Sequence, residues 1–142
     1  MKKIMSIATI LVMALLSVSC DKYDVSCSVP VFDGLTITPD QCYANDEVKI
    51  TLNIKSPGKN AYIYESVFVI YNGSKEVSRT TLSKNEFNLN YNTYKIKAPK
   101  TPGTYTISIL PRISFTAGNV IYPTNQPSEQ KAKLVVLDDE EE

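Results

Sequence analysis

The segment "DEVKITLNIKSPG" (Asp46 to Gly58) decides the fold class of this chain. Its apolar residues alternate with polar and charged ones, and they are Val48, Ile50, Leu52 and Ile54. A repeat of two residues is that of a β-strand with one face in a core. Pro57 and Gly58 then favour a turn. The segment therefore predicts a half-buried strand with a sharp end.

Similar patterns lie on both sides of this strand. Apolar residues alternate in "GLTITP" (34–39), "NTYKIKAP" (92–99) and "GTYTISIL" (103–110), and "AKLVVL" (132–137) is a last apolar run. Helical periodicity is found nowhere after residue 20. These segments predict further short strands and an all-β domain.

The longest apolar segment, "AYIYESVFVIYNG" (61–73), is apolar on both faces from Val67 to Tyr71. That pattern predicts a central strand, since both of its faces are covered. Asn72 and Gly73 favour a tight turn. The segment "EVSRTTL" (76–82) is then expected to return as an edge strand.

About seven short strands separated by proline and glycine turns fit an immunoglobulin-like β-sandwich. The segment "APKTPGTYTISI" (98–109) resembles the proline, the Pro-Gly turn and the tyrosine-bearing strand near the penultimate strand of bacterial immunoglobulin-like domains. The chain has no tryptophan and that strand has no cysteine, so the resemblance to antibody domains is one of architecture. It implies one sandwich over residues 28–137.

The N-terminus has the features of a secretory leader. Lys2 and Lys3 precede an apolar run of 15 residues, 4–18. A run of that length suits a signal peptide, whereas a membrane-spanning helix needs about 20 apolar residues.

The run ends in "SVSC", with the cysteine at position 20. This ending resembles the lipobox of bacterial lipoprotein precursors, although Leu16 lies four places before the cysteine instead of the usual three. The resemblance implies that residues 1–19 are a lipoprotein signal peptide and that Cys20 carries acyl chains such as palmitate. An ordinary signal peptide followed by a cysteine is the alternative.

Residues 20–27 are expected to form the lipidated cysteine and a tether. Asp21 and Asp24 make the tether acidic. Acidic residues after the cysteine loosely resemble a signal for the outer surface in some Gram-negative anaerobes, whereas an aspartate at the next position favours the inner membrane in enteric bacteria. We expect a lipid-anchored protein of the cell envelope, at the outer membrane on its periplasmic or surface face.

The two remaining cysteines, Cys27 and Cys42, are 15 positions apart. In an exported chain, an even number of thiols predicts a disulfide. Closing a loop of this size contributes about 3 kcal/mol in the chain-entropy account. Two free buried cysteines are the alternative.

The charges are balanced over the whole chain. Without residues 1–19 there are 13 basic and 15 acidic groups, and five of the acidic groups form the tail 138–142. Neither this balance nor that of the domain alone is basic enough for a nucleic-acid surface. The tail is expected to be disordered because its like charges repel one another.

Catalytic motifs are absent from the sequence. Histidine does not occur, which excludes Ser-His and Cys-His nucleophiles and histidine metal ligands. The carboxylate pair of Asp46 and Glu47 lies at a turn, where it is expected to be solvated. We therefore expect no enzyme, no cofactor and no metal site.

Nine tyrosines are the feature most suggestive of binding. Two interpretations are open: the tyrosines pack within the sheets, or they form an exposed platform for a sugar or a partner protein. Tyr91 and Tyr122 fall in predicted loops and are the binding candidates. The connection 114–130 is also long, and long loops on a sandwich are frequent binding sites.

Together these features predict a lipid-anchored, non-catalytic binding or adhesion module of the bacterial cell envelope. Its partners would be the membrane, through the lipid anchor, and a glycan or envelope protein held by the loops. The alternative is a structural accessory lipoprotein of an envelope complex, offering a sheet edge to its partners.

Overall fold

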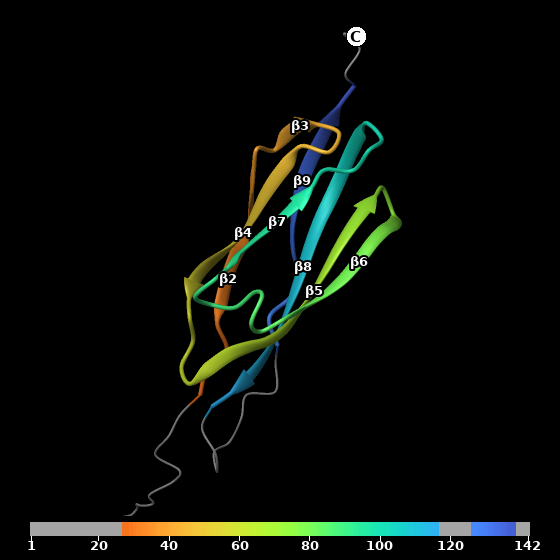
Figure 1. Cartoon of the computed structure of the whole chain (residues 1–142). Helices are drawn as coiled ribbons and strands as arrows, with labels where there is room; N and C mark the ends of the chain where they lie inside the picture. The colour runs from red at the N-terminus through yellow and green to blue at the C-terminus, as the bar shows by residue number, and fades with distance from the viewer. Residues whose placement is uncertain (1–26, 117–125, 139–142) are drawn as a thin grey trace, which may run out of the picture.

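The computed structural model describes residues 27–116 and 126–138, and Figure 1 shows their arrangement. In these two ranges the chain forms eight strands and no helix. None of the described residues therefore belongs to a helix that is long and apolar enough to cross a bilayer. The strands are β2 (Val31–Thr38), β3 (Gln41–Tyr43), β4 (Glu47–Ser56), β5 (Ala61–Asn72), β6 (Lys75–Ser83), β7 (Thr93–Lys97), β8 (Gly103–Phe115) and β9 (Gln130–Leu137).

The strands form two sheets, which Figure 1 shows as two layers. One sheet has the order β2-β4-β7, and the other has the order β3-β9-β8-β5-β6. All neighbours are antiparallel except β3 and β9, which are parallel. Apolar side chains of both sheets form one core. The predicted fold class is confirmed: the chain is an all-β, immunoglobulin-like β-sandwich.

Strand β4 places its apolar face in the core as its sequence predicts. Val48, Ile50 and Leu52 are completely buried, whereas the alternate residues are exposed or half-buried. Burying a side chain of this size contributes about 1.5–3 kcal/mol. The alternation of β4 therefore fixes which of its faces meets the opposite sheet.

Strand β5 is central, because it pairs with β8 on one side and β6 on the other. Phe68 and Ile70 point into the core, whereas Val67 and Val69 alternate with them and are buried outside it. The predicted turn at Asn72 and Gly73 leads into β6, which is the edge strand of the five-stranded sheet.

Tyr105 lies near the start of β8 and is 2% exposed. Its hydroxyl donates a hydrogen bond of 2.6 Å to the backbone carbonyl of Thr101. A tyrosine bonded back to the preceding turn is characteristic of immunoglobulin-like sandwiches. The segment 98–109 therefore has the structural role that its resemblance implies.

The sequence did not reveal strand β3, which has only three residues and no periodic pattern. It pairs in parallel with β9, and the pairing extends to a bond of 2.9 Å from the amide of Val135 to the carbonyl of Asp40. This short strand covers the end of β9.

Strand β8 continues to Phe115, well past the predicted end at residue 110. Pro111 is tolerated because the pairing with β9 ends at Ile109. Beyond it, the side-chain amide of Gln126 accepts a bond of 2.8 Å from the Ile113 amide and donates one of 3.2 Å to the Ile113 carbonyl. The Gln126 side chain thus makes the backbone hydrogen bonds that β9 would make if it extended to Ile113.

Several predicted segments lie outside the described residues. They are the signal peptide, the lipidated Cys20 with its tether up to residue 26, and residues 139–142 of the acidic tail. Of the tail, Asp138 is described, and it is exposed after the end of β9.

Candidate functional site

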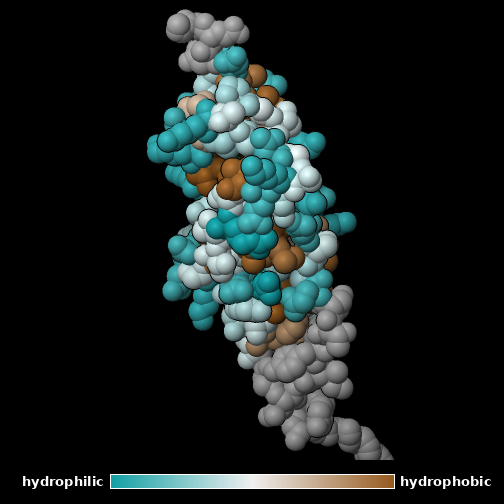
Figure 2. Space-filling view, turned by 90° about the vertical axis from the view of Figure 1, so that its right-hand side faces the viewer, coloured by the Kyte–Doolittle hydropathy of each residue, from teal (hydrophilic) through white to brown (hydrophobic). Residues whose placement is uncertain are grey.

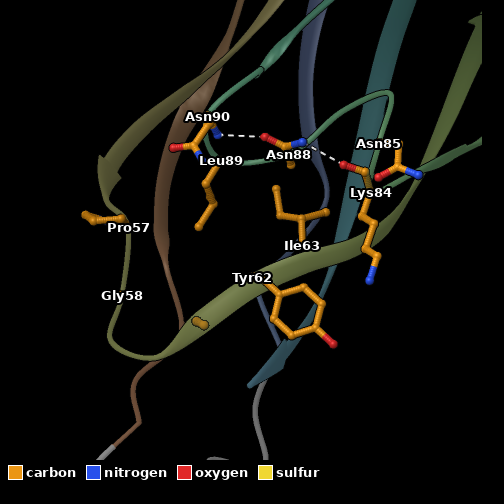
Figure 3. Close-up of a pocket in the computed structure, with 10 residues that line it drawn as sticks. Pro57, Gly58, Tyr62, Ile63, Lys84, Asn85, Asn88, Leu89 and Asn90 are labelled. Atoms are coloured by element: carbon orange, nitrogen blue, oxygen red, sulfur yellow. Dashed lines mark hydrogen bonds between the residues drawn. The ribbon is translucent and has the colours of Figure 1, made fainter. Parts of the chain in front are cut away.

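A pocket lies at one end of the sandwich, between the start of β5 and the connection from β6 to β7. We call it the end pocket. Figure 3 shows it from close by. Its volume is about 420 Å³, within the usual range for small-molecule sites. It is lined by Pro57, Gly58, Ala61, Tyr62, Ile63, Lys84, Asn85, Asn88, Leu89 and Asn90.

The connection that forms one wall of the end pocket is held by Asn88. Its side-chain amide donates a bond of 2.6 Å to the Lys84 carbonyl. Its side-chain oxygen accepts bonds of 2.8 and 2.9 Å from the amides of Asn90 and Tyr91. Asparagine commonly stabilises turns in this way. Phe87 is fully buried and anchors the connection in the core.

The other wall is the turn from β4 to β5, which packs against the first described residues. Ser28 and Lys59 exchange two backbone hydrogen bonds of 3.1 Å. Gly58 has a φ of 76°, and a Cβ there would lie 2.5 Å from the Ser28 carbonyl oxygen. Only glycine permits both this conformation and this approach. The end pocket therefore lies beside the point where the chain enters the domain.

The lining of the end pocket is apolar in its interior and polar at its rim. Ile63 is fully buried, and Figure 3 shows Ile63 and Leu89 pointing into the space between the connection and β5. Lys84 extends toward Tyr62, with its Nζ 5.7 Å from the centre of the tyrosine ring. Of the ten lining residues, Lys84 is the only one with a charged side chain.

Sequence reasoning did not select Tyr62 and Lys84 as a pair. They are 22 positions apart, and the β5-β6 hairpin brings them together. Glu65 pairs with Ser83, so Lys84 follows directly after the paired residues, at the level of Tyr64 and two positions from Tyr62. The Asn-Gly turn predicts the hairpin that brings these two segments together.

The two tyrosines selected as binding candidates have different outcomes. Tyr91 is 71% exposed and lies in the connection that borders the end pocket, bonded through its backbone to Asn88. Tyr122 lies outside the described residues. Of the other tyrosines, Tyr105 is in the core and Tyr94 packs edge-on against Phe68 at 5.1 Å, so both have packing roles.

The predicted disulfide between Cys27 and Cys42 is wrong, because both thiols are free in the structure. Cys27 directly precedes the Ser28–Lys59 bridge, whereas Cys42 lies on β3 beside the C-terminal half of β9. Between them runs β2, whose eight residues span roughly 25 Å. A disulfide needs Cα atoms within about 7 Å. The sequence spacing gave no sign that a whole strand separates the two cysteines.

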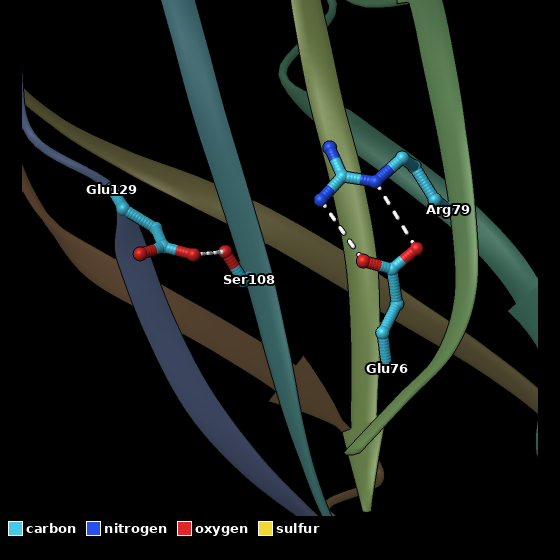
Figure 4. A network of polar contacts seen from close by, with 4 residues as sticks. All are labelled: Glu76, Arg79, Ser108 and Glu129. Atoms are coloured by element: carbon cyan, nitrogen blue, oxygen red, sulfur yellow. Dashed lines mark hydrogen bonds and ion pairs between the residues drawn. The ribbon is translucent and has the colours of Figure 1, made fainter. Parts of the chain in front are cut away.

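A set of polar contacts lies on the outer face of the five-stranded sheet (Figure 4). Arg79 and Glu76 form a two-pronged ion pair of 2.9 and 3.1 Å, which lowers the pKa of the exposed Glu76 carboxyl. Ser108 is buried and donates a hydrogen bond to the carboxylate of Glu129. These contacts satisfy polar groups on the outer face of the sheet.

A second, smaller hollow of about 290 Å³ lies on the five-stranded sheet. Tyr71, Gly73, Ser74, Thr106 and Lys131 line it. Among residues 27–116 and 126–138, no three acidic or cysteine side chains are grouped closely enough to hold a metal ion. The end pocket is therefore the stronger candidate for a binding site.

Comparison with known proteins gives no sequence relative: no family model matches the chain, and no curated protein matches it. Among solved structures, it is similar to the CARDB domain of the PF1109 protein of Pyrococcus furiosus, a structure in complex with di-metal ions. The two are 18% identical, with a TM-score of 0.40, over 79% of this chain and 97% of that one.

Proposed function

We propose that this chain is a lipid-anchored, non-catalytic binding module of the bacterial cell envelope, with the end pocket as its ligand site. The observation that carries the binding role is the pocket itself, with an apolar interior and a polar rim built by two connections. Mixed linings of this kind are typical of ligand sites. The anchor is inferred from the leader and "SVSC" (17–20).

The proposed anchor and the end pocket would lie close together. Cys20 and Cys27 are seven positions apart, and a chain of that length spans at most about 25 Å. Cys27 precedes the Ser28–Lys59 bridge beside the pocket. The pocket would therefore open within about 25 Å of the bilayer, and β3 would lie at the far end.

The anchor and the ligand site are tested separately. Intact mass of the protein extracted from membranes should show the loss of residues 1–19 and the addition of acyl chains, and Cys20→Ala should release the protein from the membrane. The purified full chain should also bind isolated cell-envelope material, and Tyr62→Ala should weaken that binding. An unmodified Cys20, or envelope binding that Tyr62→Ala leaves unchanged, would refute the corresponding half.

A second candidate is an accessory lipoprotein that adds a partner's strand to the edge of its sheet. The edge strand β6 pairs only with β5 among the described residues, and its Val77 is 49% exposed. Figure 2, which views the molecule from the side of β6, shows a largely hydrophilic surface with small separate hydrophobic areas. Charged residues such as Arg79 limit unwanted pairing of an edge. A stoichiometric partner lost on Val77→Lys would favour this function.

A further inference from the structure

The side chains at the rim of the end pocket are free to bind hydroxyl groups. Asn85 and Asn90 line it, and their side-chain amides make no hydrogen bond to any described residue. Each side-chain amide has an NH2 group that donates and an oxygen that accepts hydrogen bonds. It can therefore pair with a sugar hydroxyl, which also donates and accepts. Asn88 differs, because its amide is used to hold the connection. The pocket therefore has two unused amides on a fixed support.

Tyr62 gives the end pocket an aromatic surface. Its side chain is half-buried, and Figure 3 shows its ring on the other side of β5 from Ile63, which is fully buried. The C–H face of a pyranose ring is apolar, and placing it against an aromatic ring removes both from water. Amides at the rim and an aromatic wall together suit a ligand that is polar at its edge and apolar on its faces.

The charge in the end pocket narrows the ligand class further. Lys84 has no carboxylate partner among the described residues, and its ammonium group lies over the Tyr62 ring, 5.7 Å from its centre. A cation over an aromatic ring is weakly held and exchanges readily for a stronger partner. A ligand carboxylate would supply a charge-assisted hydrogen bond at this position.

From these contacts we propose that the end pocket binds an acidic saccharide, a sugar unit that carries a carboxylate. The ring packs on Tyr62, its hydroxyls bond to Asn85 and Asn90, and its carboxylate pairs with Lys84. This inference rests on the proposed function, since it names the ligand class of the same pocket.

Isothermal titration calorimetry on the purified full chain tests the inference. The probes are oligomers of galacturonic, glucuronic and mannuronic acid, each beside its neutral counterpart. We expect at least one uronate oligomer to bind more tightly than its neutral counterpart. Lys84→Gln should remove that preference, with a loss of about tenfold in affinity for the uronate. High salt should weaken uronate binding in the wild-type protein.

Matched variants control for damage to the fold. Lys75→Gln removes an exposed lysine at the start of β6, and Tyr64→Ala removes a tyrosine two positions after Tyr62 that does not line the pocket. Both should bind as the wild type does, whereas Tyr62→Ala should bind both kinds of sugar more weakly. Circular dichroism of each variant should keep the β-sheet spectrum.

The failures of the two proposals can be told apart. Equal affinity for uronates and neutral sugars, or a preference that survives Lys84→Gln, overturns the acidic-saccharide inference and leaves the pocket as a ligand site. Failure of every uronate oligomer to bind at millimolar concentration also overturns it. If Tyr62→Ala still weakens binding to envelope material in that case, the proposed function stands with another ligand.

Discussion

The Tyr105 hydroxyl donates a 2.6 Å hydrogen bond to the Thr101 carbonyl while the ring lies in the core with 2% exposure. One side chain thus ties the turn before β8 to the interior of the sandwich. Because Thr101 itself is exposed, water can reach its carbonyl when the hydroxyl is removed.

Replacing Tyr105 by phenylalanine removes this bond and keeps the ring. We expect the free energy of unfolding to fall by about 1 kcal/mol, the net value of a typical hydrogen bond. Urea denaturation measures the change. Tyr91→Phe is the control, because Tyr91 is 71% exposed and should unfold as the wild type does. An unchanged midpoint for Tyr105→Phe would show that the bond contributes nothing.

Gly58→Ala should destabilise the domain and detach its first described residues. The new Cβ would lie 2.5 Å from the Ser28 carbonyl oxygen, in addition to the strain of φ 76°. Gly73→Ala is the matched control, since Gly73 has a φ of 66° and open space around it. Amide exchange at Ser28 and Lys59 should rise in Gly58→Ala alone. Equal effects of the two variants would contradict the role of the close approach.

Ser66→Ala should stabilise the domain. Ser66 is completely buried, and its hydroxyl is the only buried side-chain polar atom in the described residues without a hydrogen-bond partner. Burying an unsatisfied polar group costs about 1–3 kcal/mol, so removing it should raise the free energy of unfolding by about 1 kcal/mol. Thermal unfolding provides the measurement, and a lower melting temperature would show that the hydroxyl has a partner.

Alkaline pH should reduce the stabilising contribution of Cys42. Burial, and next the negative charge of Asp46, raise the pKa of its thiol. As the pH rises above about 8.5, where unperturbed thiols ionise, the unfolded chain loses this proton before the folded one, so stability falls until the higher folded-state pKa is passed. Cys42→Ala lacks this effect. The difference between the unfolding midpoints of the two proteins should therefore shrink from neutral to alkaline pH, and a constant difference would refute the expectation.

The parts of the fold that the sequence predicted correctly depend on local patterns. The alternation of β4 predicts which of its residues are buried, and the two-sided apolar run of β5 predicts its central place. The turn at Asn72 and Gly73 predicts the hairpin with β6. These features need no information about distant residues.

The errors and omissions concern contacts between distant residues. The disulfide prediction failed because β2 separates Cys27 from Cys42. Strand β3 was missed because it is short and pairs with β9, which lies more than 90 residues later in the sequence. The end pocket was also missed, since Tyr62 and Lys84 meet only through the hairpin. Tyr91 was chosen for its loop position, and it lies in the connection that borders the end pocket.

The contact between Ser28 and Lys59 also has a mechanical consequence. If a ligand in the end pocket is pulled away from an anchor at Cys20, the tension runs through the first described residues and the β4–β5 turn. Strands β3, β9 and most of β8 lie outside this load path, so the core carries little of the force. Rupture of these two backbone hydrogen bonds would lengthen the tether and pass the load to β2, to which the chain stays covalently joined.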